Sequence, residues 1–409
     1  MSTTGASSDP LDGLALPGGD DTIAAIATAQ GRSAVAMIRL SGAGALDIAS
    51  RVVSPWPIPP RRPVLRTLRH PTTGEVLDRA LVTAHPDDNT YTGEPVVELS
   101  THGGWLVPAA VLDAVLAAGA RTALPGEFTR RAVVHGRMDL LQAEAIGDLI
   151  DARSTATRRA ALRQMDGGLS DRIQALRERI IGIEALIAYE IDFPEEDDGP
   201  VPPERVLTAC VDALDDLERL LATAHAGELI REGALVVLAG APNTGKSSLF
   251  NALLGEARAI VTDVPGTTRD ALEVVLDTAP WPIRLVDTAG LRQTSDIVER
   301  LGVEVSERYL GAADLILACA ETPAALEPTV ERIGRASPAP VLGVLTKHDL
   351  VADRDDSPGD LVPGSYQIEP VSVSAHAGTG LSELLGEIGC VLSRVADSHP
   401  AAEAPLLTR

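Results

Sequence analysis

A stretch of nine residues, GAPNTGKSS at 240–248, constrains the fold of this chain more than any other part of the sequence. It follows the apolar run ALVVLA and leads into SLFNALLG, so it connects a buried strand to a helix. Gly240, Gly245, Lys246 and Ser247 fill every fixed position of the pattern G-x-x-x-x-G-K-[ST]. Glycines let backbone N–H groups close around phosphate oxygens, the lysine meets the β/γ charge, and the serine hydroxyl can reach Mg²⁺. The pattern therefore predicts a phosphate-binding loop in an α/β domain.

Two later stretches have the order that nucleotide hydrolysis requires. PGTTRD (265–270) offers Thr267 and Thr268 to a switch that senses the γ-phosphate and Mg²⁺. DTAG closes an apolar strand, which places Asp287 near the metal and the N–H of Gly290 near the γ-phosphate.

Two further stretches select the base. In TKHD (346–349) the carboxylate of Asp349 can accept N1–H and N2–H₂ of guanine, a donor pair that adenine lacks. SAHAGTG (374–380) follows the last strand and can offer a backbone N–H to guanine O6. The sequence therefore predicts GTP as the nucleotide. The predicted GTP-binding residues are Asn243, Thr244, Gly245, Lys246, Ser247, Ser248, Thr262, Asp263, Val264, Pro265, Gly266, Thr267, Thr268, Asp287, Thr288, Ala289, Gly290, Thr346, Lys347, Asp349, Ser374 and Ala375.

Two positions depart from the common GTPase pattern. The guanine motif usually begins with Asn, and Thr346 keeps a hydroxyl but has no amide, so we expect a looser link to the phosphate loop and altered affinity without lost specificity. Ras-like enzymes place a glutamine directly after DTAG to orient the attacking water, and here Leu291 cannot bind water. Gln293 and Glu299 follow, and position alone leaves open whether either one is catalytic or merely an exposed polar residue.

Composition narrows the class of protein. A chain of 409 residues suggests two or three domains, and its net charge of −23 argues against a protein that coats nucleic acid nonspecifically. Arginines are nevertheless dense at 121–163, where a solvated helix face balanced by nearby carboxylates is the simpler interpretation. No apolar run reaches the roughly 20 residues of a membrane span, and no signal segment is evident. The three cysteines lie far apart without ligand spacing, so we expect a cytoplasmic protein without disulfides or zinc.

Hydrophobic patterning divides the chain into parts of different character. Strand-like runs such as AVAMIRL and PVVELS with one helix-like run predict an α+β domain, and a long helical pattern follows. Apolar runs that alternate with helical segments then predict a mostly parallel sheet with helices on both faces. The expected parts are 1–21, a flexible N-terminus; 22–135, the α+β domain; 136–230, an incomplete helical domain; 231–394, the GTPase domain; and 395–409, a linker.

Several longer stretches carry a resemblance to a known family. PGEFTRRAVVHGRMDLLQAEAIGDLIDA, AYEIDFPEEDD, GAPNTGKSSLFNALLG, DVPGTTRD and DTAGLRQTSDIVERLGVE, in this order, resemble the MnmE (TrmE) tRNA-modification GTPases over about residues 22–393. The resemblance implies a multidomain fold with an N-terminal folate-binding-like dimerisation domain and a Ras-like P-loop GTPase domain inserted into a helical domain. It also implies modification of the wobble uridine (U34) of tRNA at C5 with a folate one-carbon donor such as 5-formyltetrahydrofolate. The implied partners are a second copy of the chain in a homodimer, an MnmG-type flavoprotein in a heterotetramer, and tRNA, with no membrane.

The resemblance also implies roles for single residues. Glu299 matches the catalytic glutamate that positions water, and Ser247 and Thr268 match the Mg²⁺ ligands. The potassium site, which would stimulate hydrolysis through dimerisation of GTPase domains, matches Asn243, Thr262, Val264 and Thr267. The folate site matches Arg39 and Glu98, with Arg137 where the family commonly has lysine.

The last residues depart from the family, whose members continue into further helices and a Cys-x-Gly-Lys end. We therefore expect an open apolar stripe on the helices near 139–190 and 204–225, larger than the few hundred Å² that monomers tolerate. An alternative function is a regulatory GTP switch or assembly module without modification activity. A ribosome-assembly GTPase of the Era or Der type shares the GTPase motifs but not the N-terminal region.

Overall fold

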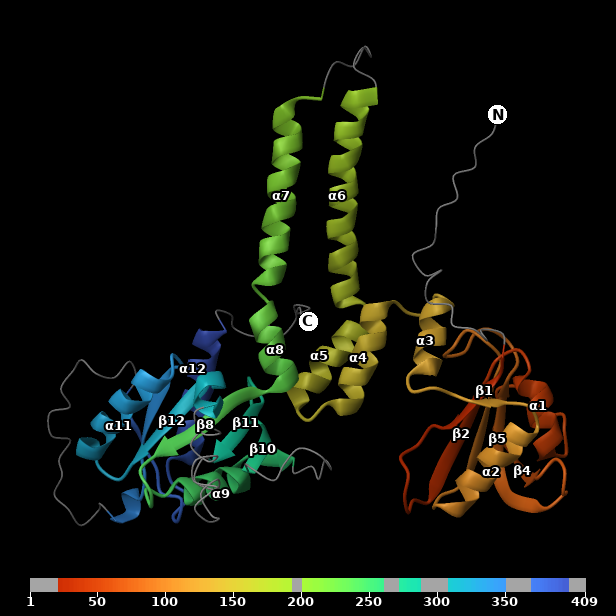
Figure 1. Cartoon of the computed structure of the whole chain (residues 1–409), viewed down its shortest axis with the longest axis horizontal. Coiled ribbons are helices and arrows are strands. Elements are labelled where there is room, and N and C mark those ends of the chain that lie inside the picture. The colour runs from red at the N-terminus through yellow and green to blue at the C-terminus, as the bar shows by residue number, and fades with distance from the viewer. Residues whose placement is uncertain (1–20, 193–200, 261–271, 288–307, 351–368, 397–409) are drawn as a thin grey trace. The chain divides into compact units, whose positions relative to one another are not determined.

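The computed structural model describes residues 21–192, 201–260, 272–287, 308–350 and 369–396 (Figure 1). Contacts divide the chain into two units, Met1–Ala143 and Glu144–Arg409, each described here by itself. The first unit is α+β, and the second contains a helical region and a mostly parallel sheet. This confirms the predicted fold class. The exact domain boundaries expected from the sequence stay predictions.

The first unit is built on a seven-stranded sheet with the order β3-β4-β5-β6-β2-β1-β7. Helices α1 (Ala45–Val52) and α2 (Leu106–Ala117) pack against one face of this sheet, where their apolar side chains share a core with the strands. The strands are β1 (Ile23–Ile26), β2 (Val35–Ser41), β3 (Val53–Ser54), β4 (Val64–Arg69), β5 (Val76–His85), β6 (Val96–His102) and β7 (Arg121–Thr122).

The other face of this sheet is only partly covered. Alternation along β2 sends Ile38 and Leu40 into the core and Arg39 to the opposite face. Leu65 and Leu81, paired across β4 and β5, are exposed there. Helix α3 (Glu127–Val134) belongs to the same unit and begins after Gly126, whose φ of 72° favours glycine.

A partly buried cluster of charges lies at the start of α3. The guanidinium of Arg131, of which 5% of the side chain is exposed, forms ion pairs with Asp21, Glu94 and Glu127. Arg121 also pairs with Asp21 and Glu127. Hydrogen bonding from Arg121 is the main cause that lowers the pKa of Glu127 to about 2. The cluster therefore needs an ionised Glu127.

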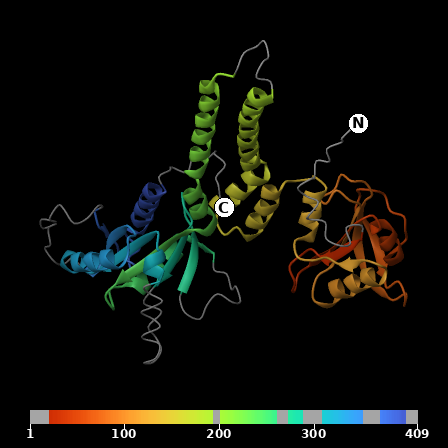
Figure 2. The ribbon, with the colours of Figure 1, turned by 45° about the horizontal axis from the view of Figure 1, so that its top comes forward.

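The long helical pattern of the sequence is divided into several helices. They are α4 (Leu140–Asp151), α5 (Thr155–Met165), α6 (Gly168–Asp192), α7 (Pro203–Leu221) and α8 (Ala224–Glu232). Ser154 caps α5, because its side chain accepts a hydrogen bond from the backbone N–H of Thr157. Helices α6 and α7 lie side by side as an antiparallel pair in both ribbon views (Figure 1, Figure 2).

Helices α6 and α7 carry a row of exposed apolar side chains, as expected from their sequence. Ile191 is 71% exposed and Leu207 is 65% exposed. The exposed apolar residues on these helices are Ile173, Ile180, Ile181, Ile187, Ile191, Leu207, Val211, Leu214, Leu217 and Leu221. Among the described residues, the stripe that would normally face a core thus faces solvent.

The second sheet has the order β14-β13-β12-β8-β11-β10-β9 and is parallel from β14 to β11. One face carries α8, α9 (Lys246–Glu256) and α12 (Leu381–Val395), and the other carries α11 (Pro323–Ala336) and residues 308–312. Because both faces are covered, strands such as β12 are buried at every position. The strands are β8 (Ala234–Gly240), β9 (Arg258–Ile260), β10 (Leu272–Asp277), β11 (Ile283–Asp287), β12 (Leu315–Ala320), β13 (Val341–Leu345) and β14 (Val371–Ser372).

Helix α5 is joined directly to this sheet. The carboxylate of Asp277, the last residue of β10, accepts hydrogen bonds of 2.8 Å each from the N–H and the hydroxyl of Thr155. The hydroxyl of Thr157 donates to the carbonyl oxygen of Ile230 at 2.7 Å. Ala156 and Ala160 pack against the core of the sheet. No helix in the described part of the chain is long and apolar enough to cross a membrane.

Candidate functional site

The phosphate-binding loop predicted from the sequence lies between β8 and α9. Gly240 has a φ of 152°, and a Cβ at that position would overlap the carbonyl oxygen of Cys319. Gly245 caps α9 with a φ of 83°, a left-handed conformation that suits glycine. Asn243 also has a positive φ, of 63°. The loop backbone therefore turns tightly enough to present its N–H groups at the N-terminus of a helix.

Two side chains in the first turn of α9 make polar contacts beside this loop. Lys246 is buried, and its ammonium donates hydrogen bonds to the carbonyl oxygens of Gly240 at 3.1 Å and Ala241 at 2.6 Å. The hydroxyl of Ser247 donates to Oδ2 of Asp287 at 2.7 Å. Asp287 ends β11 and is 1% exposed. The structure thus joins two oxygen side chains of the kind that Mg²⁺ prefers.

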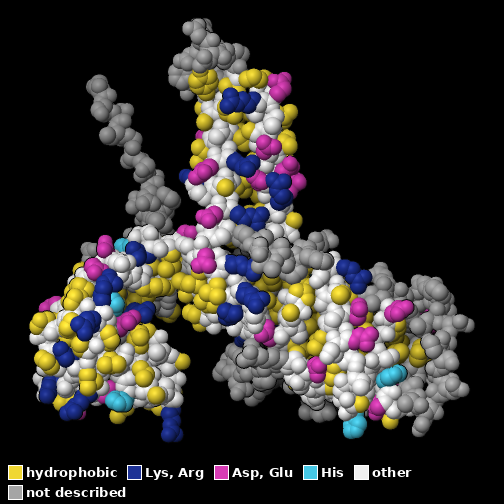
Figure 3. Space-filling model, turned by 180° about the vertical axis from the view of Figure 1, so that it is seen from behind, with side chains coloured by type: hydrophobic (Ala, Val, Ile, Leu, Met, Phe, Trp, Pro, Cys, Tyr) yellow, Lys and Arg dark blue, Asp and Glu magenta, His cyan; other side chains and the backbone are white. Residues whose placement is uncertain are grey.

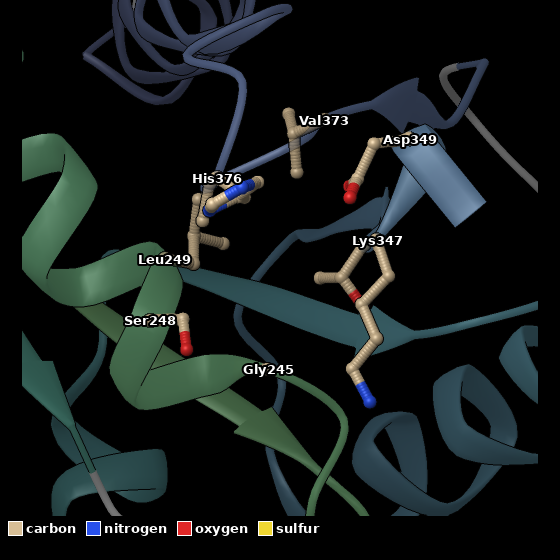
Figure 4. A pocket seen from close by; sticks show the side chains of 9 residues that line it. Gly245, Ser248, Leu249, Lys347, Asp349, Val373 and His376 are labelled. Atoms are coloured by element: carbon tan, nitrogen blue, oxygen red, sulfur yellow. The ribbon is translucent and has the colours of Figure 1, made fainter.

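A pocket of about 120 Å³ lies beside the loop, at the ends of the parallel strands (Figure 4). It contains several predicted residues and also Leu249, Val373 and His376, which the sequence reasoning did not single out. Its lining is Gly245, Ser248, Leu249, Thr346, Lys347, Asp349, Val373, Ala375 and His376. An apolar wall with a carboxylate at its rim is suited to a flat polar base.

Asp349 is held in place by its neighbour across the pocket. The hydroxyl of Ser374 donates a hydrogen bond of 2.6 Å to Oδ1 of Asp349. That hydrogen bond is the main cause that lowers the pKa of the Asp349 carboxyl below its usual range. The carboxylate is therefore ionised at neutral pH and can act as an acceptor for guanine.

Thr346 connects the base pocket to the phosphate loop. Its hydroxyl lies 2.6 Å from the carbonyl oxygen of Thr244 and is buried. The ammonium of Lys347 donates to the carbonyl oxygen of Asn243 at 3.0 Å and pairs with Glu321. The hydroxyl thus reaches the loop directly, and the looser link expected relative to asparagine stays a prediction.

Several predicted residues lie outside the described part of the chain. Of the predicted potassium set, the structure describes Asn243, and of the predicted Mg²⁺ pair it describes Ser247. The residues outside it are Thr262, Asp263, Val264, Pro265, Gly266, Thr267, Thr268, Thr288, Ala289, Gly290, Leu291, Gln293 and Glu299. Their roles stay predictions. Among the residues described, no three or more His, Cys, Asp or Glu side chains are grouped so that they could hold a metal ion.

The predicted folate residues lie in the first unit. The guanidinium of Arg39 donates to Oε1 of Glu98 at 2.8 and 3.0 Å across neighbouring strands. The rings of Tyr91 and Phe128 lie 5.8 and 5.9 Å from the Arg39 guanidinium carbon. Arg137 donates to the side chain of Asn89 at 3.2 Å. The structure thus joins Arg39 to Glu98, and Arg137 is held by the loop that carries Tyr91.

The two rings beside Arg39 were not predicted from the sequence. The whole chain has only 3 Phe, 4 Tyr and 3 Trp, and two of these aromatic rings lie beside one guanidinium. Tyr91 and Phe128 are far from Arg39 in the sequence, and no local pattern connects them. Scarcity of aromatic residues was the one signal available before the fold was known.

Two family models match the chain. One, described as the GTP-binding protein TrmE N-terminus, covers residues 22–137. The other, described as the MnmE helical domain, covers residues 140–409.

Similar proteins carry one recurring description. The tRNA modification GTPase MnmE of Moorella thermoacetica is 44% identical to this chain, over 90% of this chain and 81% of that protein. The tRNA modification GTPase MnmE of Symbiobacterium thermophilum is 41% identical to this chain, over 95% of this chain and 85% of that protein. Among solved structures, the G domain of the T. maritima FeoB iron transporter is 30% identical, with a TM-score of 0.30 over 40% of this chain and 98% of that one.

Proposed function

The chain belongs to the MnmE family of tRNA modification GTPases, and from that premise we propose that it hydrolyses GTP during C5 modification of the wobble uridine (U34) of tRNA. In this proposal it acts as a homodimer with an MnmG-type flavoprotein, in a heterotetramer, and uses a folate one-carbon donor. The observation that supports it best is the shared edge of the second sheet, where the phosphate loop and the base pocket are joined through Thr346 and Thr244.

Guanine recognition rests on Asp349 in this proposal. Its carboxylate is ionised, fixed by Ser374 and located in a pocket of about 120 Å³. A carboxylate accepts from N1–H and N2–H₂ of guanine but finds no such pair on adenine. The base is thus selected by complementary hydrogen bonds, and Leu249 and Val373 belong to the apolar part of the pocket lining.

Phosphate binding rests on the loop and on two oxygen donors. Lys246 would hold the β- and γ-phosphates at the N-terminus of α9, the end of a helix that favours anions. The hydroxyl of Ser247 and the carboxylate of Asp287, 2.7 Å apart, fit Mg²⁺ in their chemistry, and Thr268 is the further ligand proposed from the sequence. Mg²⁺ neutralises charge that develops on the phosphate oxygens.

Water attack is assigned to Glu299, because Leu291 stands where Ras-like enzymes have glutamine. The monovalent-cation site is assigned to Asn243, Thr262, Val264 and Thr267. Potassium held there would lie beside the phosphates and stimulate hydrolysis, as a positive charge from an arginine does in other GTPases. Both assignments rest on the sequence.

Folate binding is assigned to the first unit. Arg39 and Glu98 form a polar pair on the open face of the sheet, and Tyr91 and Phe128 flank it with aromatic surface. Arg137 supplies a further positive charge for a carboxylate or formyl oxygen. A flat heterocycle with polar edges, such as that of 5-formyltetrahydrofolate, fits this combination of groups.

Two measurements test the proposal. GTP turnover should be faster in KCl than in NaCl at equal ionic strength, and Asn243→Ala should abolish that difference. Equal rates in both salts would contradict the potassium site without affecting GTP binding.

The second measurement addresses the tRNA function. Mass analysis of wobble uridines in cells lacking the gene should show the loss of the C5 group, and expression of this 409-residue chain should restore it. If the chain restored cell growth but not the uridine modification, the result would favour the alternative function, a regulatory GTP switch or assembly module.

A further inference from the structure

A short segment of the second unit has an unbalanced positive charge. Residues 152–165 contain four arginines and no carboxylate, although the whole chain has a net charge of −23. The arginines are Arg153, Arg158, Arg159 and Arg163. Arg153 precedes the cap of α5, and the other three belong to α5 itself. This is a local departure from the charge of the chain as a whole.

Among the described residues these four arginines have no ion-pair partner; the same holds for the scattered Arg205, Arg332 and Arg394, but the four near α5 lie close together in the sequence. In the second unit, Arg179, Arg219, Arg231 and Arg284 all form ion pairs. Figure 3 shows Lys and Arg side chains gathered at the foot of the two long helices, where α5 lies. Their charge is therefore available to a partner of opposite sign.

The opposite face of α5 is fixed to the sheet. Thr157, Ala161 and Gln164 are buried, while Arg158 and Arg159 are exposed and Arg163 is partly exposed. The hydrogen bonds from Thr155 to Asp277 and from Thr157 to the backbone hold the helix in place. A helix anchored in this way presents its outer side chains without a large ordering cost for the backbone.

A hollow beside the start of α5 does not have the excess positive charge of the outer face of that helix. It has a volume of about 420 Å³ and lies between the start of α5 and the edge of the sheet. Its charged lining is balanced, with Arg153, Arg231 and Arg284 against Asp151, Glu232 and Glu273. An anion is therefore favoured on the outer face of α5 rather than in this hollow.

We propose that the outer face of α5 binds the sugar–phosphate backbone of the substrate tRNA. This rests on the proposed tRNA-modifying function and adds the location of the RNA contact. Guanidinium groups donate in a planar fork that matches phosphate, and they stay charged at any physiological pH. Arg159 and Arg163 are one helical turn apart, about 6 Å along the axis, so they meet successive groups of a linear polyanion.

The net charge of the chain explains why an RNA-binding surface would be confined to a small region such as the outer face of α5. A chain with charge −23 repels RNA at long range, so affinity depends on a few contacts that are free of neighbouring carboxylates. Those contacts bind through phosphate and carry little base specificity.

The test uses the full chain and an unmodified tRNA transcript with uridine at the wobble position. Its affinity is measured by fluorescence anisotropy at several KCl concentrations. Changing Arg158, Arg159 and Arg163 together to Ala should weaken binding roughly 10–100-fold and lower the slope of log affinity against log salt by about 2–3. A matched control changes Arg205, Arg332 and Arg394 to Ala, which removes the same charge from exposed positions on α7, α11 and α12.

Three further arms decide between explanations. Lys at the three α5 positions should restore most of the affinity if phosphate charge is what binds. GTP turnover of the Ala variant should equal that of the wild type, which shows that the fold is intact. Poly-L-glutamate at equal charge should not displace the tRNA if phosphate geometry contributes.

The outcomes that overturn the proposal differ from those that overturn the function. Equal tRNA affinity for wild type and the α5 variant, an equal loss in the control, or equal competition by poly-L-glutamate would reject the α5 surface. In those cases the proposed function would stand if wobble uridines still require the gene. A wild-type chain that fails to bind tRNA would reject the α5 surface as well, and unchanged wobble uridines in cells lacking the gene would reject the function itself.

Discussion

The two seven-stranded sheets of this chain differ in how many of their faces are covered. Helices pack on both faces of the second sheet, and its strands read as unbroken apolar runs such as LILACA in β12. The first sheet is covered mainly on one face, and its strands alternate, as in VAMIRLS of β2. A parallel sheet buried on both sides leaves its strand ends for chemistry, whereas an antiparallel sheet can use a face.

The candidate sites follow that difference. In the second sheet, Asp287, Thr346 and the phosphate loop all lie at the carboxyl ends of parallel strands. In the first, Arg39 and Glu98 lie in the middle of neighbouring strands and project from the open face. A site at strand ends depends on the core behind it, and a site on a face depends on the elements that partly cover it.

The largest expected effect is on stability, and it compares a buried strand of the second sheet with an exposed position of the first sheet. Leu317 in β12 is 0% exposed, and Leu317→Ala should cost about 2–5 kcal/mol of the stability of its unit, because it leaves a cavity. Leu81 in β5 is 49% exposed, and Leu81→Ala should cost less than about 1 kcal/mol. Native-state hydrogen exchange with mass spectrometry measures the two units separately in the full chain. Similar costs would mean that the open face is covered in solution.

The next prediction asks whether catalysis belongs to the strand-end site. Glu299→Ala should lower GTP turnover by roughly 10²–10³ and leave GTP affinity within a few-fold, because a positioned catalytic group is lost. Gln293→Ala serves as the control and should stay near the wild-type rate. Single-turnover kinetics with labelled GTP measure both quantities. A crippled Gln293→Ala with an active Glu299→Ala would reverse the assignment.

A third prediction concerns the charge cluster of the first unit. The folded pKa of Glu127, about 2, lies below its ordinary value of 4.5, so its stabilisation is full above that ordinary value and is lost as the pH falls toward 2. Glu127→Gln should remove on the order of 2–3 kcal/mol at pH 7 and flatten this acid dependence.

Hydrogen exchange at matched pH values between about 3 and 7 compares the stability of each unit in the wild type and in the variant. The second unit, which does not contain Glu127, is the internal control. An acid dependence that persists in the Glu127→Gln first unit would assign it to other carboxylates.

The smallest expected effect tests the link between base pocket and phosphate loop. Thr346→Val keeps the shape but removes the hydroxyl that bonds to Thr244, and should weaken GTP binding about 10-fold, or roughly 1–2 kcal/mol. Thr346→Ser keeps the hydroxyl and should stay within about 3-fold of wild type. Titration calorimetry with GTP and with ATP measures affinity and base selectivity. Equal GTP affinities of the Val and Ser variants would show that the Thr346 hydroxyl does not contribute to GTP binding.

The sequence predicted the strand-end site better than the face site, for a physical reason. The loop between β8 and α9 is formed by residues that are consecutive in the sequence. Its glycines, lysine and serine therefore form a pattern that predicts the loop geometry directly. The pocket at Asp349 and Ser374 was also predictable, because parallel strands bring their ends to one edge.

Contacts between distant residues were not predictable in this way. The guanine motif predicted a link between position 346 and the phosphate loop, but not the particular contact of the Thr346 hydroxyl with the carbonyl oxygen of Thr244, which depends on how the two loops approach in space. The rings of Tyr91 and Phe128 meet Arg39 only after β2, the loop before β6 and α3 have come together. The ion pair of Asp21 with the buried Arg131 likewise joins residues more than a hundred positions apart.

The two lysines of the sequence, Lys246 and Lys347, give the GTP site a chemical signature. Every other basic side chain apart from histidine is arginine, and both lysines contact the phosphate loop. Reagents that acylate amines therefore have two side-chain targets, one buried and one partly exposed, at the same edge of the sheet. Nucleotide occupancy can then be read by mass spectrometry as protection of two peptides, without a label on the protein or on GTP.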